Sequence, residues 1–505
     1  MYHWRPHVTS TTVAALLLIS SVEFCGSSDS TECHCKTFRW GTVCNSTSQT
    51  PSCLLKSDQV LILELPTMTR LIGPVLANMP SVHRLRIVSN SLTAIRSSAF
   101  ASDPPSEMDH LTLDVPNVTT LEPGVFKLLP RLRRLRILSA VQSLDEEELE
   151  LCPDLREVLF HAKLQKIHPG TFRQNKALSY LDLVGNNLTH LPGGLIAGNP
   201  RLETLSLTEN GIRTISAGAF RNASNLQQLI LSRNNLRTLE EGVLDDVELL
   251  TYFHASANEI TSLPPTIFAK TMLLIEIHLH LNNLMSLPKD IFAHTTNLKE
   301  LRLGDNQLKS LEPELFRHNQ RLTTLELSGN ALETLPGDVF SGLESLQYLY
   351  LSDNRLAIVP AEIFKPIAGL LQLFLSGNLL QELPGDALGA CSQLESFFLN
   401  NNQLMSLPGR LFTNSTKLST VSLENNSLRS LPVELFTGTS SLKQMWLGHN
   451  PWDCSSCEVA AMSAWLTSRD IDIGDLVPQC SGPGPQAGRD IRHVTATHCL
   501  KDSGQ

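Results

Sequence analysis

Asparagine recurs every 24 residues along most of this chain, and that period constrains the fold more than any other feature of the sequence. Leucines occupy fixed positions around these asparagines, and residues 322–340 show the pattern L-x-x-L-x-L-x-x-N-x-L-x-x-L-P-x-x-x-F. A fixed period of this length indicates units that stack along one axis, because no single unit buries its apolar face alone. The asparagine ladder comprises Asn186, Asn210, Asn234, Asn258, Asn282, Asn306, Asn330, Asn354, Asn378, Asn402, Asn426 and Asn450.

Each repeat is predicted to contribute one short strand with alternate side chains pointing into the core. The amide of each ladder asparagine can satisfy backbone groups where the chain leaves the strand. Upstream of the ladder the period drifts by about two residues, and asparagine is kept only at Asn90. Residues 57–450 are therefore predicted to hold about sixteen repeats, with a further one near Leu61. The upstream repeats are placed at Leu85, Leu111, Leu135 and Leu159.

A second periodic set of apolar residues lies in the same register as the ladder and is predicted to fill the convex side of the core. Ile196, Leu244 and Leu388 take phenylalanine's place in three repeats. Stacking of the repeats then supplies the stability, and the two ends of the stack need caps. The phenylalanines are Phe172, Phe220, Phe268, Phe292, Phe316, Phe340, Phe364, Phe412 and Phe436.

The first 28 residues are predicted to be a secretory signal peptide. A charged start is followed by an apolar run too short to span a bilayer and then by small residues. No later stretch reaches the roughly 18 apolar residues of a membrane helix, so we expect a soluble protein in the extracellular space. Six N-x-Ser/Thr sequons are compatible with that route and are candidate glycosylation sites. They are Asn45, Asn117, Asn187, Asn222, Asn414 and Asn425.

The formal net charge of −10 argues against general affinity for nucleic acid or acidic membrane surfaces. The sequence contains no G-x-S-x-G, no H-E-x-x-H and no phosphate-binding glycine loop. We therefore expect neither catalysis nor a cofactor, and a binding role is favoured.

Nine of the eleven cysteines lie near the two ends of the chain, where they would form disulfide bonds under oxidising conditions. They predict an N-terminal cysteine-rich cap over residues 29–56 and a C-terminal one over residues 451–505. Cys152 and Cys391 lie many repeats apart and are predicted to be buried free thiols.

The repeat pattern and the C-terminal segment with Trp452, Cys454 and Cys457 resemble the extracellular leucine-rich-repeat family, especially plasma and platelet members such as platelet glycoprotein V and the carboxypeptidase N regulatory subunit. Residues 181–192, 335–340, 447–452 and 480–488 carry this resemblance. It implies an α/β solenoid, curved like a horseshoe, with a parallel sheet on the concave face and a disulfide-bonded cap at each end. Those relatives continue further, whereas only residues 500–505 follow the last cysteine here, which favours a soluble protein.

The resemblance also implies the cysteine pairings. In the C-terminal cap it implies Cys454–Cys480 and Cys457–Cys499, although two residues separate the first two cysteines where the family usually has one. In the N-terminal cap, Cys33, Cys35 and Cys44 fit the family, whose fourth cysteine usually precedes them and would be Cys25. Cleavage after residue 27 or 28 would instead leave Cys53 to complete the set, and this alternative is favoured because it leaves an even number of cysteines.

Strand residues between the leucines point to solvent on the concave face, so candidate binding residues follow from the register. Aromatic residues at outward positions on neighbouring strands are unusual and are typical of binding hot spots. The preferred partner site is therefore Tyr348, Tyr350, Phe374, Phe398 and Trp446. A basic strip near the N-terminus is either a site for a sulfated glycan or an acidic protein segment or simply a solvated face, and the solvated face is favoured. It comprises Arg84, Arg86, Arg134, Arg136 and Arg156.

The middle of the concave face is predicted to carry a charge network of Glu276, Glu300 and Glu326 around Arg302. Histidines lie on adjacent strands beside it, at His254, His278 and His280. A zinc site is conceivable there, but their ring nitrogens need not converge on one point, so histidines without a bound metal are favoured.

The function predicted from these features is that of a secreted glycoprotein that binds an extracellular protein partner through the concave face. It would serve either as a stabilising or regulatory subunit of an extracellular enzyme or in cell adhesion. The alternative is a matrix or innate-immune recognition protein that binds a glycan or microbial ligand.

Overall fold

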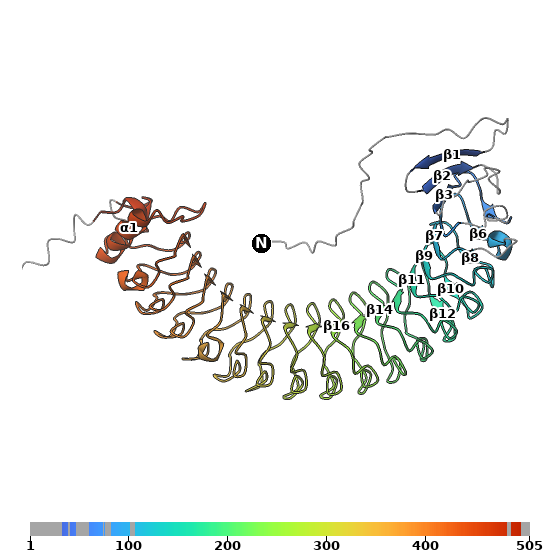
Figure 1. Cartoon of the computed structure of the whole chain (residues 1–505). Coiled ribbons are helices and arrows are strands. Elements are labelled where there is room, and N and C mark those ends of the chain that lie inside the picture. Colours follow the sequence, from blue (N-terminus) through green and yellow to red (C-terminus); the bar gives the residue numbers. More distant parts are fainter. Residues whose placement is uncertain are drawn as a thin grey trace, which may run out of the picture.

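The computed structural model describes residues 33–38, 41–46, 60–73, 75, 82–101, 107–481 and 486–495. The segment expected to be a signal peptide lies outside these ranges. The chain forms one open arc with strands along its concave side (Figure 1). Within the described ranges, a single sheet contains 19 strands. The expected curved solenoid with a parallel concave sheet is thus confirmed.

The sheet begins with a short antiparallel hairpin of β1 (Cys33–Phe38) and β2 (Gly41–Ser46), and β2 pairs in parallel with the first repeat strand. The upstream repeats contribute five-residue strands, and the first of them includes Leu61. These strands are β3 (Val60–Glu64), β5 (Arg84–Val88), β7 (His110–Asp114), β9 (Arg134–Leu138) and β11 (Glu157–His161).

From residue 180 onward the strands shorten to three residues, and each pairs in parallel with the next at a constant step of 24. Upstream the step varies, since Arg84 pairs with His110 and Arg134 with Glu157. The three-residue strands are β13 (Tyr180–Asp182), β14 (Thr204–Ser206), β15 (Gln228–Ile230), β16 (Tyr252–His254), β17 (Glu276–His278), β18 (Glu300–Arg302), β19 (Thr324–Glu326), β20 (Tyr348–Tyr350), β21 (Gln372–Phe374), β22 (Ser396–Phe398), β23 (Thr420–Ser422) and β24 (Gln444–Trp446).

The asparagine ladder links each repeat to the one before it. The Nδ2 of Asn234 donates to the carbonyl of Leu207 in the preceding repeat and to that of Leu231 in its own, both at 2.9 Å. Its Oδ1 accepts from the backbone N–H of Ile212 at 3.0 Å. The other ladder amides repeat this pattern, as Asn306 and Asn402 show. The predicted backbone role of the ladder is confirmed, and its bonds cross the repeat boundary.

Asn90 does not belong to this ladder, which corrects the sequence-based assignment. Its side chain is exposed, whereas the neighbouring Ser89 is buried. The Ser89 hydroxyl donates to the Leu65 carbonyl and accepts from the Leu92 N–H. A serine directly after a five-residue strand thus takes the role that an asparagine takes after a three-residue strand.

The convex side of the core consists of turns and short helices packed on the phenylalanine series. Phe268 and Phe292 stack with ring centroids 6.2 Å apart, and Phe292 and Phe316 with centroids 6.0 Å apart. In the upstream repeats this side carries two-residue strands: β4 (Arg70–Leu71), β6 (Ala94–Ile95), β8 (Thr120–Leu121), β10 (Ser143–Leu144) and β12 (Lys166–Ile167). The short 3-10 helices are η1 (Ser97–Phe100), η2 (Lys365–Ile367), η3 (Val433–Phe436) and η4 (Ile491–His493).

The C-terminal cap closes the apolar end of the stack. Helix α1 (Cys457–Arg469) begins after Ser456, whose hydroxyl accepts from the Glu458 N–H. Trp465 of this helix stacks on Phe436 of the last repeats with centroids 4.2 Å apart. Trp452 is fully buried and donates its Nε1–H to the Leu447 carbonyl at 3.1 Å.

Cys44, Cys454, Cys457 and Cys480 are disulfide-bonded, as expected. Cys454 and Cys480 form a disulfide, as the resemblance implied, and Cys457 is also disulfide-bonded, although its expected partner Cys499 lies outside the described residues. Cys44 is buried and disulfide-bonded. Cys25 and Cys53, the alternatives for the fourth N-terminal cysteine, lie outside the described ranges.

The two isolated cysteines are free and buried, as predicted: Cys152 and Cys391. Burial raises the pKa of each thiol to about 12, because the thiolate would lose its hydration. Neither is therefore a reactive thiolate at neutral pH.

We expect Asn234→Ala to lower the free energy of unfolding by about 2–5 kcal/mol, because two carbonyls and one N–H would lose their partners inside the core. Asn235→Ala is the matched control, since this exposed neighbour bonds only to the exposed Glu259 side chain. Urea denaturation and hydrogen exchange of the Ile212 amide measure the effect. Equal shifts in the two variants would contradict the role assigned to the ladder.

Candidate functional site

The parallel register arranges the concave-face side chains in rows that run along the arc. The first residue of each three-residue strand belongs to the first row, and the third residue belongs to the second row. The side chains of both rows point away from the core. From β16 to β24 the second row begins with histidine and charged residues and continues with aromatic ones. The order is His254, His278, Arg302, Glu326, Tyr350, Phe374, Phe398, Ser422 and Trp446.

Four aromatic side chains of this row, Tyr350, Phe374, Phe398 and Trp446, form a continuous stack that we call the aromatic row. The rings of Tyr350 and Phe374 are 4.7 Å apart and inclined by 14°, and those of Phe374 and Phe398 are 4.6 Å apart and inclined by 4°. Phe398 reaches Trp446 at 6.1 Å although a strand lies between them. The small Ser422 of that strand leaves the space for this contact.

The aromatic row lines a groove of ≈960 Å³ on the concave face. Glu326 and Arg302 lie at one end of the groove, and Glu424 lies near Trp446 at the other. All four aromatic side chains are half-buried, so each keeps an accessible surface. The groove therefore combines an apolar floor with carboxylates at its ends.

The carboxylates at the groove ends are poorly hydrated. Burial raises the pKa of Glu326, even though the Ser328 N–H donates to it at 2.9 Å. Burial also raises the pKa of Glu424 and that of the Tyr350 hydroxyl. A desolvated carboxylate is stabilised by a positive charge placed next to it, so this groove favours a basic ligand over an acidic one.

Tyr348 does not join the aromatic row, although it lies on the same strand as Tyr350. It belongs to the first row of concave side chains, between Thr324 and Gln372. It does not line the groove. The structure thus brings four of the five predicted partner residues together and leaves Tyr348 beside them.

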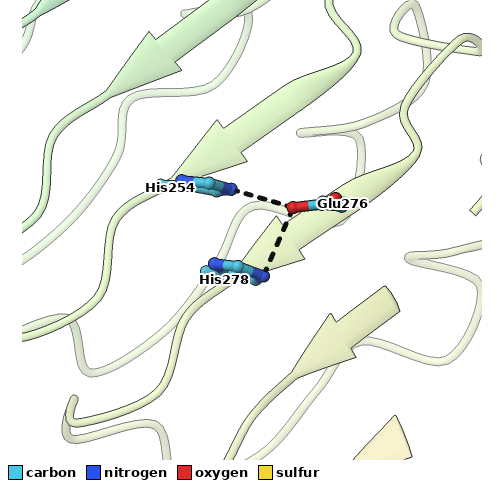
Figure 2. A group of neighbouring side chains, drawn as sticks. All are labelled: His254, Glu276 and His278. Atoms are coloured by element: carbon cyan, nitrogen blue, oxygen red, sulfur yellow. Dashed lines mark ion pairs between the residues drawn. The ribbon is translucent and has the colours of Figure 1, made fainter. Parts of the chain in front are cut away.

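Histidine and carboxylate side chains converge in the other half of the row (Figure 2). The rings of His254 and His278 stack with centroids 4.0 Å apart and an inclination of 6°. One carboxylate oxygen of Glu276 lies 3.5 Å from the Nε2 of His254 and 3.7 Å from the Nε2 of His278. Two of the three histidines thus converge on Glu276, while His280 lines a neighbouring hollow with its ring 5.8 Å from that of His278.

The predicted charge network is present around Arg302. The Glu300 carboxylate contacts the Nε of Arg302 and lies 3.0 Å from the Nε2 of His278. The hydrogen bond from His278 is the main reason why the pKa of Glu300 falls to about 2, and Arg302 contributes to it. Burial together with the charge of Glu300 raises the pKa of Glu276. Sequence reasoning missed the convergence on Glu276, although its in-register position beside both histidines could have revealed it.

The basic strip is partly neutralised by its neighbours. Arg86 pairs with Asp114 at 3.0 Å and Arg134 with Glu157 at 2.9 Å, both across adjacent strands. Within the described ranges, Arg84 and Arg136 make no ion pair. Arg156 precedes β11 and falls outside the rows formed by the other four. The strip is therefore less basic than the sequence suggested.

Two family descriptions match the chain. "Leucine rich repeat" matches residues 158–212, 200–260 and 296–356. "BspA type Leucine rich repeat region (6 copies)" matches residues 63–179 and 357–463. Together they cover well over half of the sequence. No curated protein matches it.

Solved structures with a similar fold include one from a bacterium and two from an insect. A leucine-rich-repeat protein of Leptospira interrogans is 25% identical, with 80% of this chain and 92% of that chain covered and a TM-score of 0.61. Two structures of the Drosophila Toll–Spatzle complex are each 19% identical and cover 92% of this chain. The matched regions make up 75% and 72% of those chains, and the TM-scores are 0.68 and 0.74. Among the described residues of this chain, no helix has both the length and the apolar character to cross a bilayer.

We expect the buried histidines to destabilise the fold in mild acid. Burial lowers the pKa of His254 and of His280 to about 4, below the roughly 6.5 of an unfolded histidine. Both states are neutral above pH 6.5, but between pH 6.5 and 4 the unfolded state binds more protons, so stability falls as pH falls. The loss by pH 5 is about 1–2 kcal/mol for each histidine.

The measurement is the change in melting temperature between pH 7.5 and pH 5, with a chelator present so that metal ions do not contribute. The double variant His254→Gln, His280→Gln should lose less stability than the wild type over this interval. His294→Gln, at an exposed histidine, is the control. A double variant as acid-sensitive as the wild type would refute the prediction.

Proposed function

Because the chain belongs to the leucine-rich-repeat proteins, we propose that it is a secreted glycoprotein that binds an extracellular protein partner through the groove of the aromatic row. This fold is typical of protein-binding scaffolds, and the matched families are generally non-enzymatic. The Toll structures are those of a complex with Spatzle, so a fold neighbour engages another protein. The binding role itself rests on the aromatic row.

The aromatic row carries the proposal because the fold does not require it. The core is complete without these side chains, since the same row holds Ser206, Ile230 and Ser422 in other repeats. Large aromatic side chains that stay accessible in a groove are the usual centres of protein-binding surfaces. Their mutual stacking holds the rings in place before binding, which lowers the entropy lost on association.

The groove specifies the chemistry of its partner. Its floor fits an apolar or aromatic side chain, and Glu326 and Glu424 at its ends fit lysine or arginine. We therefore infer a partner segment with apolar residues flanked by basic ones. Such a contact suits a stabilising or regulatory subunit of an extracellular enzyme, or an adhesion protein.

Secretion is supported by the disulfides and by the sequons. Disulfides persist in oxidising compartments, and Cys454–Cys480 closes the C-terminal cap. Five sequon asparagines have exposed side chains, which a glycan requires: Asn117, Asn187, Asn222, Asn414 and Asn425. Asn45 lies where side chains are not described.

The alternative function, recognition of a sulfated glycan or microbial ligand, finds less support. A glycan site would rely on the basic strip, where Arg86 and Arg134 already pair with carboxylates. The carboxylates at the ends of the groove would repel a sulfate group. A basic protein segment is the better match to this face.

We expect Tyr350→Ala and Phe374→Ala each to weaken partner binding by about tenfold or more, as loss of a hot-spot aromatic does. Tyr348→Ala is the matched control, because this tyrosine lies on the same strand but outside the groove. The wild-type protein is used as bait in the extracellular fluid of its source, and the captured partner is then titrated against each variant.

Both variants should fold, because serine already occupies the same row position on β14 and β23. Circular dichroism of each variant checks this point. Undiminished capture by Tyr350→Ala and Phe374→Ala, or an equal loss in Tyr348→Ala, would disprove the site.

A further inference from the structure

We propose that His254, His278 and Glu276 form a binding site for Zn²⁺ on the concave face of the solenoid. This site lies on β16 and β17, several strands from the aromatic row, and does not depend on the proposed protein-binding function. Three observations carry it: the distances between the donor atoms, an unpartnered nitrogen and the local charge.

The register of the sheet creates the donor set. His254 pairs with His278 across β16 and β17, and Glu276 precedes His278 by two residues, so all three side chains point to the concave side. Their donor atoms lie within 4.8 Å of one another. Two imidazoles and a carboxylate are a donor set that zinc commonly uses in proteins, with the remaining position open.

Two of the three distances between donor atoms are close to those around a tetrahedral zinc ion. Zinc bonds to histidine nitrogen and carboxylate oxygen at about 2.0–2.2 Å, so its ligand atoms lie about 3.3–3.6 Å apart. One oxygen of Glu276 is 3.5 Å from the Nε2 of His254 and 3.7 Å from that of His278. The two rings are nearly parallel, so coordination requires both to rotate until their Nε2 atoms point at one ion.

The Nε2 of His254 is buried and makes no hydrogen bond among the described residues, although a carboxylate oxygen of Glu276 lies 3.5 Å away. Buried polar atoms of proteins are almost always satisfied, so an unpartnered nitrogen needs an explanation. This atom faces Glu276, as Figure 2 shows. An ion between the two would satisfy both groups at once.

The charge around the site also favours a divalent cation. Glu276 and Glu300 bring two negative charges, and Arg302, which contacts Glu300, brings one positive charge. Glu300 also lies 3.0 Å from the Nε2 of His278, so this hydrogen bond breaks when the nitrogen loses its proton and binds the ion, and the carboxylate then borders the ion without belonging to the three donors. His280 faces the neighbouring hollow with Asp305 and takes no part.

The test is calorimetric titration of Zn²⁺ into the full-length secreted protein after treatment with a chelator. We expect one ion per chain, and we expect His254→Ala and His278→Ala each to weaken its binding by more than about 100-fold, beyond the 10–100-fold typical of outer residues. His280→Ala is the matched control and should bind as the wild type does. Co²⁺ in place of zinc should give a visible spectrum that both ligand variants lose.

The variants should fold, because this row position accepts serine, isoleucine and arginine in other repeats. Circular dichroism and the elution volume of each variant verify folding. Absence of stoichiometric zinc binding by the wild type overturns the proposal. So does zinc binding that survives both substitutions, or that falls equally in His280→Ala, because the ion would then be held by other histidines.

Discussion

The hydrogen bonds of the ladder asparagines are the interaction on which the rest of the structure depends. Each amide bonds to backbone groups of its own repeat and of the preceding one, as Asn234 does with Leu207, Leu231 and Ile212. Because an amide can reach both repeats only at one offset, it sets the register of the strands as well as their spacing. Where asparagine is absent, as at Ser89, the strands lengthen and the step between repeats varies.

A constant register has a consequence for the surface. Side chains that are 24 residues apart become neighbours, so residues of one chemical type that recur at this interval form a row. Phe268, Phe292 and Phe316 do this inside the core, where stacking stabilises the solenoid. Tyr350, Phe374 and Phe398 do it on the concave face, where stacking instead prepares a binding surface.

The second row is divided into two chemically different halves. His254, His278 and Arg302 occupy it on β16 to β18, with Glu276 and Glu300 beside them, and the aromatic row extends from β20 to β24. Arg302 and Glu326 connect the halves, since Arg302 contacts Glu300 on one side and both line the groove on the other. An ion held in the first half would therefore alter the electrostatic potential at the end of the groove. The two proposals concern separate sites on one continuous surface.

The sequence by itself determined the repeat length, the inward residues, the free cysteines and the outward positions of the aromatic residues, because all of these follow from a period that is visible in one dimension. Tertiary structure decided which outward residues meet. Sequence placed Tyr348 and Tyr350 together, but strand pairing joined only Tyr350 to Phe374. It likewise stacked the rings of His254 and His278 beside Glu276, while His280 only touches His278 edge-on and faces another hollow. Contacts of this kind depend on side-chain direction and on the neighbour across each strand. The small Ser422, for example, lies between Phe398 and Trp446 and lets their rings meet. A pattern of residue types does not contain that information.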